Sequence, residues 1–244
     1  MNLRKYIISI LLLIPFYSNG QTKVTHEWFY WIRFYNQFKF RKHYTLHTEV
    51  DTRRHFSDSR QSQFFTHIHL HRRLKPWLDV ALGFNYNFTQ QPADPKLKVP
   101  ELRPWQEITL FSTNNSHWPF LFRYRLDERF IHNNTKDELT DGYHFNLRHR
   151  FRVGVSTELA NFNNKSNLTL RFYDEVMINT GDVPRAFDQN RISASLEYQF
   201  NKRWSVESGY INILQPRTDT DYYDRHVIRT TFFYRLEQGI ESGD

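Results

Sequence analysis

Arginine and acidic side chains alternate with apolar ones between residues 120 and 130. Arg123, Arg125, Asp127 and Arg129 stand at every second position there, and most positions between them are aromatic or aliphatic. In a β-strand alternate side chains fall on opposite faces, so the charged groups would form one ladder. A helix would instead scatter these arginines among the aromatics. A ladder of this kind can either pair with carboxylates or attract anions.

Similar charged alternation recurs in later segments, at 148–152, 171–175 and 191–197. If all these segments turn their charged face to one interior, arginines would outnumber acids there. A paired structural network is the simpler account, because buried charges need partners. An anion-selective pore or a site for an anionic ligand is the functional alternative. The candidate interior residues are Arg123, Arg125, Asp127, Arg129, Arg148, Arg150, Arg152, Arg171, Glu175, Arg191 and Glu197.

Three histidines, His67, His69 and His71, also share one face of a predicted strand. Residues two apart project together, so these rings could in principle ligate a metal. The sequence shows no second cluster of cysteines, histidines or acids to complete the ligand set. We therefore interpret the three histidines as part of a polar wall and expect no metal and no cofactor.

No catalytic motif is recognisable in the chain. The acid pairs at 127–128 and 174–175 are adjacent in sequence, so their carboxylates would point to opposite faces and could not act together in glycoside hydrolysis. Ser193 and Ser195 fall on a predicted inner face, but the sequence places no histidine and acid beside them. A glycine-rich phosphate loop is also missing. The sequence therefore gives no basis for assigning an enzymatic activity.

The elements that must position these residues are strands. Candidates of about 9 to 14 residues, the span of a tilted membrane strand, recur along the chain. Their ranges are 26–40, 44–53, 63–74, 78–89, 102–111, 120–130, 143–155, 168–179, 190–200, 204–212 and 228–236. The connections between them tend to alternate between short and long. The predicted fold is all-β, a closed antiparallel up-and-down transmembrane β-barrel of 10–12 strands.

The segments above number eleven, whereas bacterial single-chain barrels have an even number of strands. We therefore expect ten or twelve strands, with one pair merged or one strand missed. The long first segment and the region around Asn161 are the places where we expect this to have happened.

The orientation of the sheet follows from the cost of charge in lipid. An arginine that faces the middle of a bilayer costs about 2 to 4 kcal/mol, and three of them would approach the whole stability of an ordinary domain. Arg123, Arg125 and Arg129 must therefore face inward, with Phe120, Phe122, Tyr124, Leu126 and Phe130 on the outer face.

Three tryptophans stand at or just before the start of predicted strands, at the end of short connections. These residues are Trp77, Trp118 and Trp204. Indoles are enriched where a membrane meets water, so the three are predicted to form one interfacial girdle. The alternative is that each caps the core of a soluble protein, because aromatic side chains also bury well.

The first twenty residues have the layout of a cleavable secretory signal. Arg4 and Lys5 precede an apolar centre at 6–16, and small or polar residues follow at 18–20. An N-terminal core helix is the alternative. The predicted organisation is a signal peptide at 1–20, a barrel at 21–236 and a polar tail at 237–244. Without cysteines an exported protein needs another source of stability, and a closed sheet supplies one.

Composition limits the class of protein further. The chain of 244 residues suits one all-β domain of barrel size. Its mean hydropathy is -0.72, and no apolar run reaches the roughly 18 residues that a spanning helix requires. The net charge of +7 could suit nucleic acid, but the basic residues are spread along the strands, not gathered in a tail or helix, so no nucleic-acid partner is expected.

Three short segments resemble a known family. They are RPWQE at 103–107, RYRLDER at 123–129 and FDQNR at 187–191. With these motifs the chain resembles the exported proteins grouped as domain of unknown function 2490, which are frequent in Bacteroidota. The resemblance covers most of the mature chain and implies an outer-membrane β-barrel but no activity. The ending departs from the common barrel pattern of a terminal aromatic residue, because a polar tail follows Leu236.

The main hypothesis is a monomeric barrel in the cell outer membrane, in contact with its lipid. It would pass or bind a small anionic solute through an arginine-rich lumen, or be purely structural. One alternative is a membrane-embedded lipid hydrolase resembling outer-membrane phospholipase, which needs a serine and a histidine together on the lipid-facing surface. Another is a soluble secreted barrel that holds a ligand.

Overall fold

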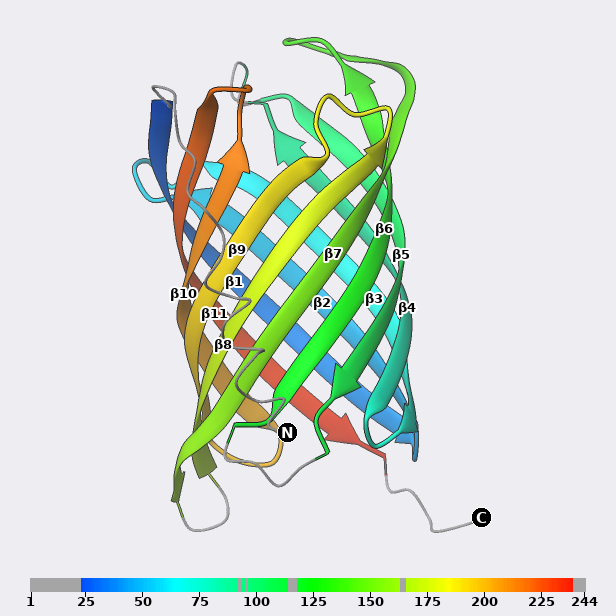
Figure 1. Cartoon of the computed structure of the whole chain (residues 1–244), viewed down its shortest axis with the longest axis vertical. Coiled ribbons are helices and arrows are strands. Elements are labelled where there is room, and N and C mark those ends of the chain that lie inside the picture. The colour runs from blue at the N-terminus through cyan, green and yellow to red at the C-terminus, as the bar shows by residue number, and fades with distance from the viewer. Residues whose placement is uncertain (1–22, 92–93, 95, 114–117, 163–165, 239–244) are drawn as a thin grey trace, which may run out of the picture.

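A computed structural model shows one sheet of eleven strands that closes on itself (Figure 1). The structure describes residues 23–91, 94, 96–113, 118–162 and 166–238. Each strand pairs with its neighbours in sequence, and the last strand pairs with the first. The prediction of an all-β, closed, up-and-down barrel is therefore confirmed.

The strands are longer than the sequence suggests, with 12 to 24 residues each instead of about 9 to 14. Alternation fades where both faces of a strand are polar, yet the backbone still pairs there until the turn. The bounds are β1 (Lys23–Arg41), β2 (Tyr44–His55), β3 (Gln61–Lys75), β4 (Leu78–Gln90), β5 (Lys98–Phe111), β6 (Phe120–Asn134), β7 (Leu139–Phe162), β8 (Ser166–Gly181), β9 (Phe187–Gln199), β10 (Trp204–Pro216) and β11 (Asp221–Glu237).

The barrel closes through a parallel pair. β1 and β11 run side by side with Lys23 opposite Asp221 and Lys39 opposite Glu237, whereas all other pairs are antiparallel. Successive strands alternate in direction, so the first and last strands of an odd number point the same way and can only pair in parallel. The preference for ten or twelve strands was wrong, because β1 and β7 are each one continuous strand and β7 runs through the region around Asn161.

Alternating strand direction gives the barrel two rims. Strands β1, β3, β5, β7 and β9 end at the lower end in Figure 1, and strands β2, β4, β6, β8 and β10 end at the upper end. We call these ends the lower rim and the upper rim. Trp77 and Trp118 precede β4 and β6, and Trp204 is the first residue of β10, so all three lie at the lower rim.

The outer face of the sheet is apolar. Leu82, Phe120, Val153 and Ile192 expose 55 to 64% of their surface, and other large apolar side chains are exposed on every strand. No second layer of protein covers this face, because the described strands form a single closed sheet. The predicted orientation, with aromatic rows outside and arginines inside, is confirmed for the segment 120–130, where Phe120 and Phe122 face out.

The interior has only a small apolar part. Phe29 and Trp31 of β1 pack with Ile211 and Ile213 of β10 and Val227 of β11. Most other buried side chains are polar or charged, including aspartates, glutamates and arginines. In the described residues we find no helix of the length and apolarity that a membrane crossing needs.

The ends of the predicted organisation fall largely outside the described residues. The whole predicted signal peptide at 1–20 and residues 239–244 of the predicted tail belong to this part. Glu237, predicted as the first tail residue, is the last residue of β11.

Candidate functional site: a cationic cavity inside the barrel

The barrel encloses a cavity of about 930 Å³. All eleven strands contribute to its lining, from Gln91 beyond the upper end of β4 to Ser112 and Pro119 in the lower-rim connection between β5 and β6. Fifteen arginines but only seven acidic residues line this space. The described acids hidden behind them do not change the sign of this balance, because they number fewer than the difference.

Strand register brings like charges face to face on β6 and β7. Arg123 lies opposite Arg152, and Arg125 lies opposite Arg150. Like charges directly across a strand pair repel one another. The arrangement therefore requires carboxylates placed among the four guanidinium groups.

Glu175 of β8 is the first of these carboxylates and has no exposed surface. It accepts a hydrogen bond from Arg123, one from Nη2 of Arg150 at 2.9 Å and one from Nη2 of Arg152 at 3.3 Å. One buried negative charge thus serves three arginines. A shared carboxylate of this kind offsets the repulsion between the facing arginines.

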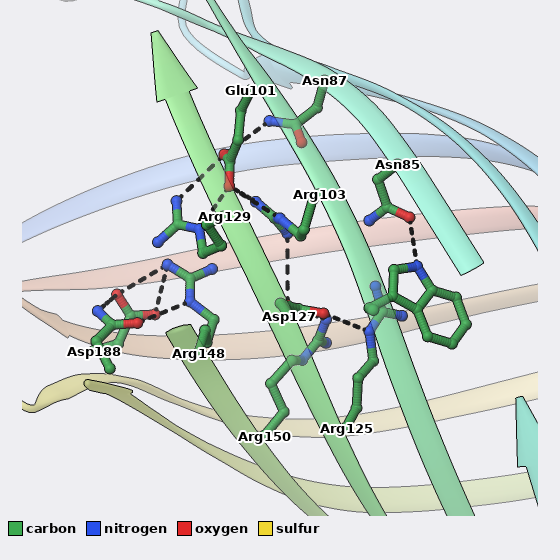
Figure 2. Close-up of polar contacts among 12 residues, drawn as sticks. Asn85, Asn87, Glu101, Arg103, Arg125, Asp127, Arg129, Arg148, Arg150 and Asp188 are labelled. Atoms are coloured by element: carbon green, nitrogen blue, oxygen red, sulfur yellow. Dashed lines mark hydrogen bonds and ion pairs between the residues drawn. The ribbon is translucent and has the colours of Figure 1, made fainter. Parts of the chain in front are cut away.

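Asp127 of β6 is the second carboxylate and is equally buried. Its Oδ1 accepts a hydrogen bond from Nε of Arg125 at 2.6 Å, and its Oδ2 lies 3.6 Å from Arg150 and 3.8 Å from Arg103. Figure 2 shows these three arginines converging on Asp127 from different strands. We call Arg123, Arg125, Arg150 and Arg152, with Asp127 and Glu175, the arginine network.

Two further carboxylates extend the pairing toward the upper rim (Figure 2). Glu101 of β5 accepts hydrogen bonds from Arg103 at 2.8 Å and Arg129 at 2.6 Å. Asp188 of β9 accepts one from Arg148 at 3.1 Å. The cations on this side are therefore held in fixed directions by multiple bonds.

The wall formed by β8 to β11 repeats this arrangement. Glu197 accepts hydrogen bonds from Arg171 at 2.5 Å and from Arg235 at 2.7 Å. Glu207 accepts one from Arg229 at 2.9 Å. Charge-assisted bonds of this length are the stronger kind, so these side chains also have restricted motion.

Arg191 differs from the other arginines of the cavity. Its Nε donates a hydrogen bond to Gln189 at 3.1 Å, and its guanidinium lies 5.5 Å from the Trp31 ring centre. Within the described ranges no carboxylate lies at ion-pair distance from it, although it lines the cavity. Arg191 therefore presents a cation whose charge is not compensated locally.

Aromatic rings stack against several guanidinium groups. Arg125 lies 3.7 Å from the Trp105 ring centre, and Arg53 lies 3.8 Å from that of Trp31. Nε1 of Trp105 donates a hydrogen bond to Asn85 at 2.8 Å, which fixes the indole. A planar guanidinium stacked on a ring keeps its N–H groups directed along the plane, toward polar partners.

The structure places the predicted interior residues in or behind the wall of one cavity. Nine of them line the cavity, while Asp127 and Glu175 lie buried in the wall behind it; the nine are Arg123, Arg125, Arg129, Arg148, Arg150, Arg152, Arg171, Arg191 and Glu197. The ion pairs between these residues support the interpretation as a structural network. The surplus of arginines over acids supports the interpretation as a site for anions.

Sequence reasoning missed several members of the site. Glu101, Arg103 and Trp105 share the inner face of β5. Pro100 and Pro104 interrupt the polar and apolar alternation from which the start of this strand could have been predicted. The connection between the predicted strands 78–89 and 102–111 gives its last residues, from Lys98, to β5. Asp188 lies outside the predicted strands 168–179 and 190–200, whereas β9 begins at Phe187, beside a register shift in its pairing with β8.

Only two of the three histidines of the predicted row belong to one cluster in the structure. His67, His69 and His71 all line the cavity, but only His69 and His71 group together, and His47 of β2 joins them. One ring nitrogen from each of these three lies within 4.8 Å of the others. A metal is thus better matched by the set His47, His69 and His71 than by the consecutive row.

The outer face gives little support to hydrolysis. In the part of the chain that the structure describes, no hydrogen bond joins a serine hydroxyl to a histidine ring, and Ser193 and Ser195 are buried inside. Tyr124 and Tyr210 are the partners of the outward His149 and His226. The lipid hydrolase alternative is therefore no better supported than before.

The fold and the site together define a closed β-barrel with a charged interior. A model of the family described as "Protein of unknown function (DUF2490)" matches residues 28–224, and the chain belongs to this family. The chain is also 27% identical over 190 residues to Protein Ycf2 of Angiopteris evecta. The aligned region covers 73% of this chain but only 7% of the length of Protein Ycf2. No solved structure matches the chain.

Proposed function

We propose that the protein is an outer-membrane β-barrel whose cationic lumen binds and passes small anionic solutes. The observation that carries this proposal is the lining of the cavity, with fifteen arginines against seven acidic residues. Rings of arginine or lysine are the usual source of anion selectivity in pores. Fixed guanidinium groups also match carboxylates and phosphates in geometry.

Membrane residence is supported by the distribution of side chains. Exposed apolar residues follow every strand of the outer face, and such an uncovered surface on a water-soluble protein would aggregate. A closed sheet also leaves no unpaired edge, which is what a strand structure needs in lipid. Partners are then outer-membrane lipid and a small anion, with the barrel acting as a monomer.

The predicted leader at 1–20 and the three tryptophans of the lower rim agree with this location. Trp77, Trp118 and Trp204 expose 46 to 50% of their surface, as residues at a lipid–water boundary would. In this arrangement the lower rim lies at one interface of the membrane.

Passage is supported by the extent of the cavity. Its lining includes residues of both rims, and its volume of about 930 Å³ lies in the range of cavities that hold a small molecule. The paired carboxylates hold the arginines in place, while Arg191 offers charge to a solute.

The first test is location. Cell fractionation should recover the protein with the outer membrane, and an unboiled sample should migrate differently from a boiled one on a gel. A periplasmic protein whose mobility is indifferent to heating would contradict the membrane reading and would favour the soluble secreted ligand-binding barrel.

The second test is selectivity. In planar bilayers under a KCl gradient we expect a reversal potential whose sign shows selectivity for anions over cations. The double variant Arg152→Gln/Arg191→Gln should shift this potential toward zero. Arg185→Gln is the matched control, because Arg185 lies in the β8–β9 connection, bonded to Asp219 at 2.8 Å. A folded barrel that passes no current and binds no anion would leave only the structural role.

A further inference from the structure

We propose that His47, His69 and His71 form a binding site for a divalent transition metal, with Zn²⁺ as the reference ion. We call these three residues the histidine cluster. The cluster lies on β2 and β3 inside the barrel, whereas the arginine network lies on β6 to β8. The inference does not depend on where the barrel resides or on whether it conducts.

Backbone register creates the cluster from two strands. β2 pairs with β3 so that His47 lies opposite His69 and Thr45 lies opposite His71. The three side chains project inward, and their ring centres are 4.2 to 5.0 Å apart. One nitrogen of each ring lies within 4.8 Å of those of the other two, so one ion could reach all three after a small adjustment.

The other nitrogen of each ring is held by a separate partner. Nδ1 of His71 lies 2.6 Å from the Asp79 carboxylate, and Nε2 of His69 lies 3.0 Å from that of Glu49. Nδ1 of His47 lies 2.5 Å from the Tyr35 hydroxyl. Histidines that ligate metals almost always donate their second N–H to a carboxylate or another oxygen, which fixes the tautomer and the ring direction.

Of the nitrogens that remain, those of His69 and His71 face each other. Nδ1 of His69 and Nε2 of His71 are 2.9 Å apart and share a hydrogen bond in the metal-free cluster. Two nitrogens that bind zinc at 2.0–2.1 Å in tetrahedral geometry lie about 3.3 Å apart. Zinc would therefore replace one proton between the rings and separate them by a few tenths of an ångström.

The cluster is open to the cavity, and the carboxylates beside it are each paired with an arginine. Glu49 and Asp79 bring two carboxylates to the cluster, while Arg33 lies 3.4 Å from Glu49 and Arg73 lies 3.4 Å from Asp79. His69 and His71 line the cavity. Three imidazoles leave a fourth position of a tetrahedral site open toward the cavity, where water or an anion could bind.

The test uses the full-length barrel, purified without a polyhistidine tag and stripped with chelator. We expect one equivalent of zinc by elemental analysis and a tetrahedral Co²⁺ absorption band. His69→Gln and His71→Gln should each weaken zinc binding at least about 100-fold, and Glu49→Gln about 10- to 100-fold. His67→Gln is the matched control, since His67 lies on the same face of β3 but outside the cluster, and it should retain the wild-type affinity.

Folding is checked by the heat-dependent gel shift. If a variant misfolds, X-ray absorption of the zinc-loaded wild type replaces it, and three zinc–imidazole distances of about 2.0–2.1 Å are expected. A folded wild type that takes up no stoichiometric zinc would overturn the proposal. Equal loss in His67→Gln and His69→Gln would also overturn it, because the lumen histidines would then bind metal without a defined site.

Discussion

The arginine network and the histidine cluster lie on the inner face of the same barrel but handle buried polarity differently. In the arginine network one carboxylate serves several cations, as Glu175 does for Arg123, Arg150 and Arg152. In the histidine cluster each carboxylate holds one ring, as Asp79 does for His71. Permanent charges thus need shared counter-charges, whereas imidazoles need only an oriented partner.

The difference has consequences for what each region can bind. The arginine network stays cationic at every physiological pH, because a guanidinium does not lose its proton. It can attract an anion but cannot release its charge. The histidine cluster offers imidazole nitrogen atoms, which suit a metal ion. One cavity thereby contains two chemically distinct walls, and single substitutions can separate them.

The largest effect is expected when the arginine network loses its shared carboxylate. Glu175→Gln leaves three buried guanidinium groups without their common partner, and breaking a buried pair costs about 3–5 kcal/mol. Urea unfolding of the barrel in detergent micelles measures this loss. Glu138→Gln, at an exposed position of the upper-rim connection before β7, is the control and should change little. Equal effects of the two changes would show that the network contributes no specific stability.

A smaller effect is expected from overpacking the histidine cluster. A Cβ at Gly83 would overlap the Trp105 indole and lie 2.7 Å from Cβ of His69. Gly83→Ala should therefore cost about 1–3 kcal/mol of unfolding free energy and displace His69. Unfolding and zinc affinity are measured together. Gly154→Ala, whose Cβ would lie 3.3 Å from the Phe172 carbonyl oxygen, should cost less and leave zinc binding intact.

The two walls meet at Trp105, and its hydrogen bond should contribute less again. Its ring centre lies 5.1 Å from that of His69, and Arg125 stacks at 3.7 Å on the indole. Trp105→Phe keeps a ring there but removes the donor to the fully buried Asn85, at a cost of about 1–2 kcal/mol. A double-mutant cycle with Asn85→Ala should abolish that cost. A cost that persists in the Asn85→Ala background would assign the effect to ring packing.

The smallest effect is expected outside both walls, at the lower rim. Trp204 and Tyr234 have ring centres 4.5 Å apart, and such pairs contribute about 0.5–1.5 kcal/mol. Trp204→Leu should lower stability by that amount in lipid vesicles and leave zinc and anion binding unchanged. An effect as large as that of Glu175→Gln would mean that the rim, not the interior network, dominates stability.

Much of this barrel can be predicted from local alternation. Charged residues at every second position of 120–130 place Arg123 and Arg125 inside, and the same rule places all the candidate cavity residues on the inner face. The rule fails where prolines or short polar segments interrupt it, as at Pro104 on β5 and at Asp188 on β9. The interior positions of Arg103 and Asp188 were missed for this reason.

Partners across the sheet are not contained in local alternation. The consecutive histidines of β3 were visible, but His47, which completes the cluster, lies on β2 and meets them only through register. Likewise nothing local indicates that Glu175 meets Arg123, 52 positions away in the chain. Register depends on turn lengths and bulges as well as pattern, so pairs between strands were out of reach.

The amino-acid sequence by itself determined the all-β fold, the faces of most strands and the cationic character of the interior, because a side-chain period of two is a property of each strand alone. Tertiary structure decided the rest. Closure by parallel pairing of β1 with β11 settled the odd strand number, and register chose which carboxylate holds which arginine and which histidine joins His69 and His71. These choices depend on contacts between distant segments, which only the closed sheet brings together.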